Sequence, residues 1–191
     1  MELFHWCLDR LPARCGKWGG FVGSDDHKVY ALDAKTGTEL WSYTTDGEIF
    51  ISAPAVRNGI AYVGSCGIGT GHTVYPLNAS TGTLLWSYAT GAGIQASFAI
   101  EGGLIYVASA DTALYALDAT TGVKRWDYLS GGFYTSSPTA ANGVIYIGSG
   151  AYGLATSHGE RAGWRTLYRA PGGGRKMFLT SPCIDQALTR F

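Results

Sequence analysis

Residues 116–126 read Ala116-Leu117-Asp118-Ala119-Thr120-Thr121-Gly122-Val123-Lys124-Arg125-Trp126. The same pattern occurs twice earlier in the chain, at residues 31–41 and 76–86. The tryptophans that end the three copies stand at positions 41, 86 and 126, and are therefore 45 and 40 residues apart. A period of this size is typical of repeat architectures, so we expect one structural unit to recur along the chain.

Each copy of the pattern predicts a β-hairpin. An apolar run such as residues 114–117 precedes an Asp or Asn, whose side chain can accept hydrogen bonds from backbone N–H groups at the start of a turn. The Gly that follows can adopt a positive φ. A second run carries the Trp, and the alternation of side chains in both runs favours strands over helices.

A second hairpin is predicted between successive copies. Its two runs are joined at Asn58-Gly59, Gly102-Gly103 and Asn142-Gly143 in the three units, and these pairs favour two-residue hairpin turns. One repeat is therefore four short antiparallel strands in about 40 residues, which is the size and composition of a propeller blade.

The repeat resembles the tryptophan-docking motif of the pyrroloquinoline quinone (PQQ)-like β-propeller family over roughly residues 21–150. In that family, the Trp packs on the Ala that opens its own motif and on the Gly of the next motif. The second copy departs from the motif because it has Pro76 in the place of the Ala and Asn in the place of the Asp. By this resemblance the structural motif residues are Ala31, Asp33, Gly37, Trp41, Asn78, Gly82, Trp86, Ala116, Asp118, Gly122 and Trp126.

The resemblance implies an all-β fold, a partial β-propeller of about three to three and a half four-stranded blades that form an open arc. We expect a divergent N-terminal segment (residues 1–20), propeller repeats (21–150) and a divergent C-terminal tail (151–191). The chain is expected to enter its first blade at the second strand, near Phe21. A degenerate outer hairpin is one interpretation of residues 166–178. The loss of the repeat at both ends predicts a fragment of a larger propeller, or a truncated or frame-shifted one.

Composition excludes several classes of function. The formal net charge is zero and no run of Lys or Arg occurs, so nucleic acid is not an expected partner. No apolar run is long enough to span a membrane, and the first residues lack the pattern of a secretory signal. The resemblance nevertheless implies a periplasmic or extracellular location. Charged residues make up 15% of the chain, against about 25% in typical domains.

The polar residues of the motif do not predict a catalytic site. Asp33, Asn78 and Asp118 occupy one repeat position, whereas catalysis needs a single asymmetric site, so we expect them to cap turns. The glycine-rich residues 67–71 lie between two predicted strands and lack the helix of a phosphate loop. Cys66 and His72 are the one pair close enough in sequence to test with a metal. We therefore predict no catalytic residue and no metal site.

PQQ dehydrogenases hold their quinone at the propeller axis with Ca²⁺ and often have two adjacent cysteines. The four cysteines here, at positions 7, 15, 66 and 183, are not adjacent, and no carboxylate matches a ligand of that family. No cofactor is therefore expected, and PQQ and calcium are possible only in a complete quinoprotein.

The resulting hypothesis is a non-catalytic repeat scaffold or binding module, similar to the outer-membrane assembly propellers of bacteria. The alternatives are a fragment of a PQQ-dependent dehydrogenase and the ligand-binding sensor portion of a larger receptor or kinase. The expected partner is a protein or the missing blades of the same propeller. The terminal blades keep the apolar pattern of the inner ones, and end repeats need polar outer faces to stay soluble. Self-association of the chain, or marginal folding, is therefore expected.

Overall fold

The computed structural model describes residues 14–16, 19–49, 52–67, 71–129 and 136–148, together with the strands at 164–169 and 179–180. Over these residues the regular structure is entirely β, in four antiparallel sheets of four strands each, which confirms the predicted fold class. Each sheet is a meander in which consecutive strands pair. We call the sheets the first to fourth blades, in chain order.

The strands of the four blades have the following bounds. The first blade comprises β1 (Arg14–Gly16), β2 (Gly19–Gly23), β3 (Lys28–Leu32) and β4 (Glu39–Thr44). The second comprises β5 (Ala55–Arg57), β6 (Ile60–Gly64), β7 (Thr73–Asn78) and β8 (Tyr88–Ala89). The third comprises β9 (Ala99–Glu101), β10 (Leu104–Ala108), β11 (Ala113–Asp118) and β12 (Lys124–Leu129). The fourth comprises β13 (Thr139–Ala141), β14 (Val144–Gly148), β15 (Trp164–Arg169) and β16 (Leu179–Thr180).

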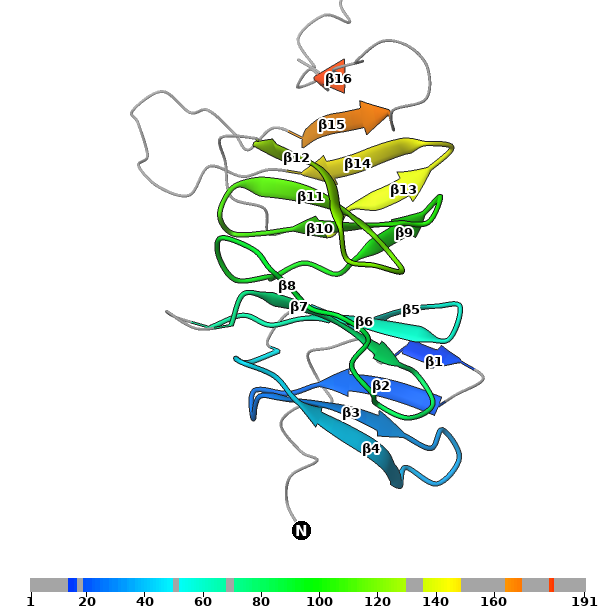
Figure 1. Cartoon of the computed structure of the whole chain (residues 1–191). Coiled ribbons are helices and arrows are strands. Elements are labelled where there is room, and N and C mark those ends of the chain that lie inside the picture. Colours follow the sequence, from blue (N-terminus) through cyan, green and yellow to red (C-terminus); the bar gives the residue numbers. More distant parts are fainter. Residues whose placement is uncertain are drawn as a thin grey trace, which may run out of the picture.

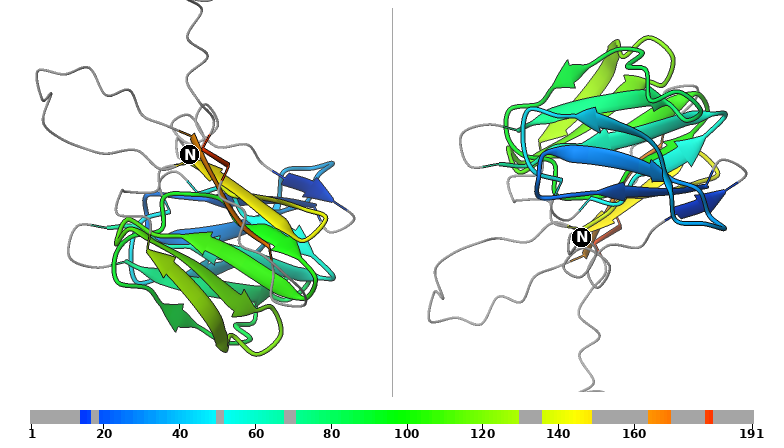
Figure 2. Two further views of the ribbon diagram at one scale, coloured as in Figure 1. Left: turned by 90° about the horizontal axis from the view of Figure 1, so that it is seen from above. Right: turned by 90° about the horizontal axis from the view of Figure 1, so that it is seen from below.

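The blades stack face to face in chain order, from the first blade at the bottom of Figure 1 to the fourth at the top. Figure 2 shows the same stack from above and from below, and in these views successive blades are rotated relative to one another. The first and fourth blades lie at opposite ends of the stack, so the described sheets form an open arc.

The turns between the first two strands of the second and fourth blades have the predicted geometry. Asn58 and Gly59 both have positive φ, of 52° and 76°, and Arg57 pairs with Ile60 across the turn. Asn142 and Gly143 have φ values of 54° and 73°. Two consecutive residues with positive φ match the right-handed twist of the paired strands, which explains the Asn-Gly pairs.

The paired strands extend beyond the repeat that the sequence shows. Arg14 pairs with Phe21, so β1 gives the first blade a strand that precedes the predicted point of entry near Phe21. At the other end, β15 and β16 complete the fourth blade, and Tyr146 pairs with Thr166. The structure therefore has four blades rather than three to three and a half. Backbone pairing needs no particular side chain, so a strand without the motif can still close a sheet.

In the terminal blades, buried and more exposed side chains alternate along a strand, whereas in the inner blades successive side chains are buried. In the inner blades, β6 and β10 are buried on both faces from their second to their last residue. In β14 of the fourth blade only Ile145 and Ile147 are buried, and Tyr146 between them is exposed. In β3 of the first blade only Val29 and Ala31 are buried. An inner blade is thus covered on two faces and a terminal blade on one.

Candidate functional site

The candidate site is the set of contacts through which one blade holds the next, and the first of them is made by Trp41. Its indole Nε1 donates a hydrogen bond of 3.2 Å to the carbonyl oxygen of Ala79 in the second blade. The ring lies on Gly82, where an added Cβ would be 2.7 Å from the ring's Cε3. Ala31 pairs with Trp41 across its own hairpin. The ring therefore lies between the Ala of its own motif and the Gly of the next.

Trp86 repeats this contact between the second and third blades. Its Nε1 donates to the carbonyl oxygen of Ala119 at 3.4 Å, and an added Cβ on Gly122 would be 2.5 Å from Cε3. The same Ala119 oxygen also accepts a hydrogen bond of 3.2 Å from the Tyr62 hydroxyl. One carbonyl of the third blade thus receives two donors from the second, and this role of Tyr62 was not predicted from the motif.

Trp126 lies in the corresponding position of the third blade. It pairs with Ala116 across the hairpin, and its ring is 5.9 Å from that of Tyr106. The segment that follows β15, where the next motif glycine is expected, lies outside the described residues. The contact between a motif Trp and the motif Gly of the next blade is therefore described for Trp41 and for Trp86.

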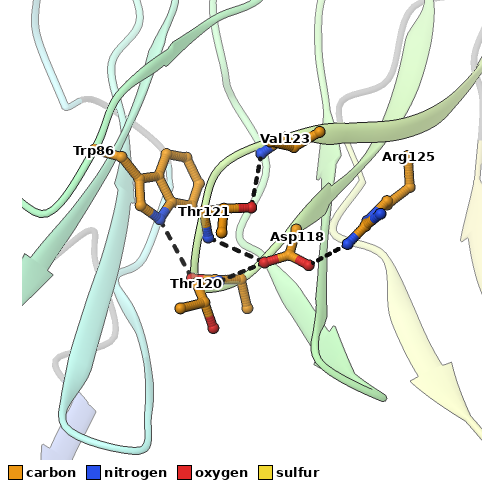
Figure 3. A network of polar contacts seen from close by, with 7 residues as sticks. Trp86, Asp118, Thr120, Thr121, Val123 and Arg125 are labelled. Carbon is orange, nitrogen blue, oxygen red and sulfur yellow. Dashed lines mark hydrogen bonds and ion pairs between the residues drawn. The ribbon is translucent and has the colours of Figure 1, made fainter.

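The Asp or Asn of each motif holds the turn that carries the motif glycine, and in the third blade this is the turn on which Trp86 docks. The Asp118 Oδ1 accepts hydrogen bonds of 3.0 Å from the amides of Thr120 and Thr121, and Oδ2 accepts one of 2.8 Å from Arg125 (Figure 3). The Arg125 bond, together with the two amides, holds the pKa of Asp118 well below its usual value. Asp118 is therefore ionised and fully engaged at neutral pH.

The other two copies of this turn use the same geometry. Asp33 accepts hydrogen bonds of 2.9 Å from the amides of Thr36 and Lys35, and these bonds lower its pKa. Asn78 accepts bonds of 2.9 and 3.2 Å from the amides of Ser80 and Thr81 through its side-chain oxygen. A neutral amide thus replaces the carboxylate in the second blade without changing the turn. The motif glycines Gly37, Gly82 and Gly122 all have φ near 70°.

Pro76 changes the second blade in a way that follows from its chemistry. It takes the place of the Ala that pairs with Trp in the other blades, and it has no N–H for the sheet. The outer strand β8 is limited to Tyr88–Ala89, whereas β4 and β12 each have six residues. Trp86 docks on Gly122 nonetheless, because that contact is made to the next blade and not to the Pro.

A hydrogen-bonded aspartate also lies at the loop end of each of the first three blades. In the third blade, Asp111 accepts from the Tyr115 hydroxyl at 2.6 Å and from the Gly91 amide at 2.7 Å. Burial, followed by the bond to Asp111, raises the pKa of Tyr115. In the first blade Asp26 accepts from the Tyr30 hydroxyl.

In the second blade the aspartate comes from a different segment. Asp46, from the linker before the blade, accepts hydrogen bonds of 2.5 Å from Ser65 and 2.6 Å from Thr73. Its amide donates to the Tyr75 hydroxyl at 3.1 Å. Burial alone would raise the pKa of Asp46, but these hydrogen bonds outweigh burial and lower it. Burial also raises the pKa of Tyr75, to about 12.

Serines link the innermost strands of three successive blades. The Ala53 amide donates to Ser97 Oγ, and the Ser97 amide donates to Ser137 Oγ, each at 3.0 Å. These three residues occupy one repeat position, just before β5, β9 and β13. The sequence signal is a repeated dipeptide of small residues, Ser52-Ala53, Ala96-Ser97 and Ser136-Ser137. The dipeptide alone does not reveal its partner in the next blade.

Two further candidates from the sequence are Cys66 and the glycine-rich loop at residues 67–71. Cys66 forms a β-bridge with Glu48, and its Sγ would be 2.8 Å from a Cβ added at Gly93. Three residues of the glycine-rich loop 67–71 lie outside the described residues. In the part of the chain that the structure describes, no group of three or more His, Cys, Asp or Glu side chains could hold a metal. Over the same residues, no helix has the length and apolar character needed to cross a membrane.

Comparison with known families gives a match over the whole repeat region, residues 21–150. The model of the family described as outer membrane protein assembly factor BamB matches residues 20–96 and 71–171. This match confirms the expected resemblance to PQQ-like propeller repeats. No curated protein matches the chain.

Solved structures show the same fold. BamB from Moraxella catarrhalis is 19% identical, with a TM-score of 0.67 over 88% of this chain and 51% of its own. Quinohemoprotein alcohol dehydrogenase from Comamonas testosteroni is 18% identical, with a TM-score of 0.62 over 74% and 29%. The computationally designed Ika4 protein is 18% identical, with a TM-score of 0.59 over 73% and 82%. The chain thus spans about half the length of the matched BamB.

Proposed function

The chain belongs to the family of the outer membrane protein assembly factor BamB, and we propose that it is a non-catalytic propeller module that binds protein partners during outer membrane protein assembly. The observation that carries this proposal is the family match, which extends across residues 20–171. The propeller repeat itself is shared with a quinohemoprotein dehydrogenase, so the fold alone does not select between assembly and catalysis.

The engagement of the motif side chains supports a scaffold. Asp33 and Asp118 each hold two backbone amides of their own turn, and Asp118 also holds Arg125. Trp41 and Trp86 use their ring nitrogens to bind the next blade. These hydrogen-bonded side chains stabilise the arc of blades. A stable arc holds its loops and strand edges at fixed distances from one another, where a partner protein can bind them.

The proposed location is the periplasmic side of the outer membrane. The family description, which names an outer membrane protein assembly factor, supports this location. The partners we propose are the β-barrel proteins under assembly or the other proteins that assemble them. The complete propeller would have more blades than this chain supplies, since the matched BamB is about twice the length that this chain spans.

A complementation experiment tests the function. The chain would be secreted to the periplasm of a bacterium that lacks its own BamB, and the folded fraction of an outer-membrane β-barrel protein would be measured by its heat-dependent mobility in gels. We expect the folded fraction to rise. The matched control is the Trp41→Ala/Trp86→Ala double variant, which loses two contacts between blades and should give no rise. A folded, secreted chain without effect would overturn the proposal.

A further inference from the structure

The fourth blade exposes a side chain that the other blades bury. Tyr146 in β14 has 45% of its surface exposed, whereas its equivalents Tyr62 and Tyr106 are each 2% exposed and Phe21 is 1% exposed. In the inner blades this side chain faces the following blade, as the bond from Tyr62 to Ala119 in the third blade shows. Tyr146 therefore marks the face of the fourth blade on which a further blade would pack.

The first blade has the opposite incomplete face. Val22 and Leu32 are only half-buried. Their equivalents in the third blade, Val107 and Leu117, are fully buried, and so are those in the second blade. In the inner blades these residues face the preceding blade. Val22 and Leu32 therefore mark the face on which a preceding blade would pack.

The two incomplete faces correspond to the two sides of an interface between inner blades. Between the second and third blades, Tyr62 belongs to the same buried cluster as Val107 and Leu117. The equivalents of these three residues are Tyr146, Val22 and Leu32. A second copy would therefore offer Tyr146 the side-chain types that Tyr62 already packs against within the chain. Its Ala34, the equivalent of Ala119, would offer the carbonyl oxygen.

We propose that two copies of the chain associate head to tail, with the fourth blade of each on the first blade of the other, and so close a ring. A contact between two different surfaces closes when the rotation between copies completes a circle, and otherwise gives open filaments. Two copies supply eight blades, and closed propellers have roughly four to eight. The chain covers 51% of the matched BamB, so two copies together have about the length of one such protein. This length agrees with a ring of two copies. This inference does not rest on the proposed function.

Size-exclusion chromatography with light scattering tests the ring. From low to high micromolar concentration we expect one species with twice the 20.3 kDa mass of the chain. Tyr146→Arg and Leu32→Arg should each give the mass of a single chain, because either change introduces a charge at both contacts of the ring. The matched control is Leu85→Arg, since Leu85 is 46% exposed on the outer edge of the second blade, close to the 45% of Tyr146. This variant should keep the doubled mass.

Mixing the two charged variants distinguishes a contact between the fourth and first blades from a contact between two identical blades. In the mixed pair, one contact carries both changes and the other carries neither, so we expect the doubled mass to return. Each variant must first show a cooperative thermal melt, and Val22→Ser replaces Leu32→Arg if the latter does not fold. The proposal is overturned if the unaltered chain is a single-chain species at every concentration, if its mass grows without limit, or if mixing restores nothing.

Discussion

The indole of Trp86 lies directly on the backbone of Gly122, so that a Cβ added there would be 2.5 Å from the ring's Cε3. Gly122 also has a φ of 74°. Gly122→Ala should therefore destabilise the chain twice over, by about 1–2 kcal/mol for the left-handed backbone and by about 1–3 kcal/mol for overpacking. Urea unfolding followed by circular dichroism measures the sum.

Gly59 provides the matched control for this prediction. Its φ of 76° is nearly the same, but an added Cβ would meet no atom within 4 Å. Gly59→Ala should cost the backbone term alone. The difference between the two variants should disappear in a Trp86→Ala background, because the ring that Gly122→Ala strikes is then absent. A difference that persists there would mean that Trp86 is not the cause.

A second prediction concerns the tryptophans as a class. Trp86→Ala should lower the free energy of unfolding by roughly 3–5 kcal/mol, through lost aromatic packing on the next blade. Trp86→Phe keeps an aromatic ring but removes the bond to Ala119, so it should cost less. Trp6, Trp18 and Trp164 lie outside the motif, and their replacement by Ala should matter less than that of Trp86 or Trp126. Equal losses for Trp164→Ala and Trp126→Ala in urea melts would contradict the docking assignment.

The parts of the fold that sequence could predict are those fixed by short-range chemistry. The Asn58-Gly59 turn and the Asp118 cap each depend on a few neighbouring residues, and both were expected. The strands β1, β15 and β16 were missed or left open because no side chain of the motif marks them. The role of Asp46 was also missed, since it comes from a linker and reaches across to Ser65 and Thr73. Such contacts depend on how blades stack, which a repeat pattern does not specify.

The third prediction is a dependence of stability on acid. The pKa of Asp118 is depressed in the folded chain below the ordinary value of 3.8. Its stabilising effect is therefore present above pH 3.8 and is lost as the pH falls from there towards the lower folded value. Asp118→Asn should show a smaller loss of stability than the unaltered chain between pH 7 and pH 3 in paired urea melts. Asn78, which caps the same turn in the second blade, indicates that the variant will fold. Parallel pH curves for the two proteins would contradict the assignment.

A fourth prediction concerns the serines that join the inner strands. Ser97→Ala leaves the amide of Ala53 without its side-chain acceptor, and Ala53 is only 3% exposed. A buried donor that loses its partner costs about 1–3 kcal/mol. The exposed Ser87, on the outer edge of the second blade, is the matched control, and Ser87→Ala should change the unfolding midpoint little. If Ser97→Ala is as mild as Ser87→Ala, the serines do not hold the blades together.

The last prediction concerns the cofactor. We expect no dye-linked oxidation of alcohols or sugars when PQQ and Ca²⁺ are added to the chain. The reason lies in the sequence, where no two cysteines are adjacent and no carboxylate matches a quinoprotein ligand. In the structure, Asp33 and Asp118 already bind backbone amides of their own turns, so ligation of Ca²⁺ by either would have to displace those bonds. A fluorescence titration with PQQ in the presence of Ca²⁺ should therefore show no saturable binding, and a calcium-loaded quinoprotein dehydrogenase is the positive control. Saturable binding together with turnover would favour the dehydrogenase alternative over the assembly scaffold.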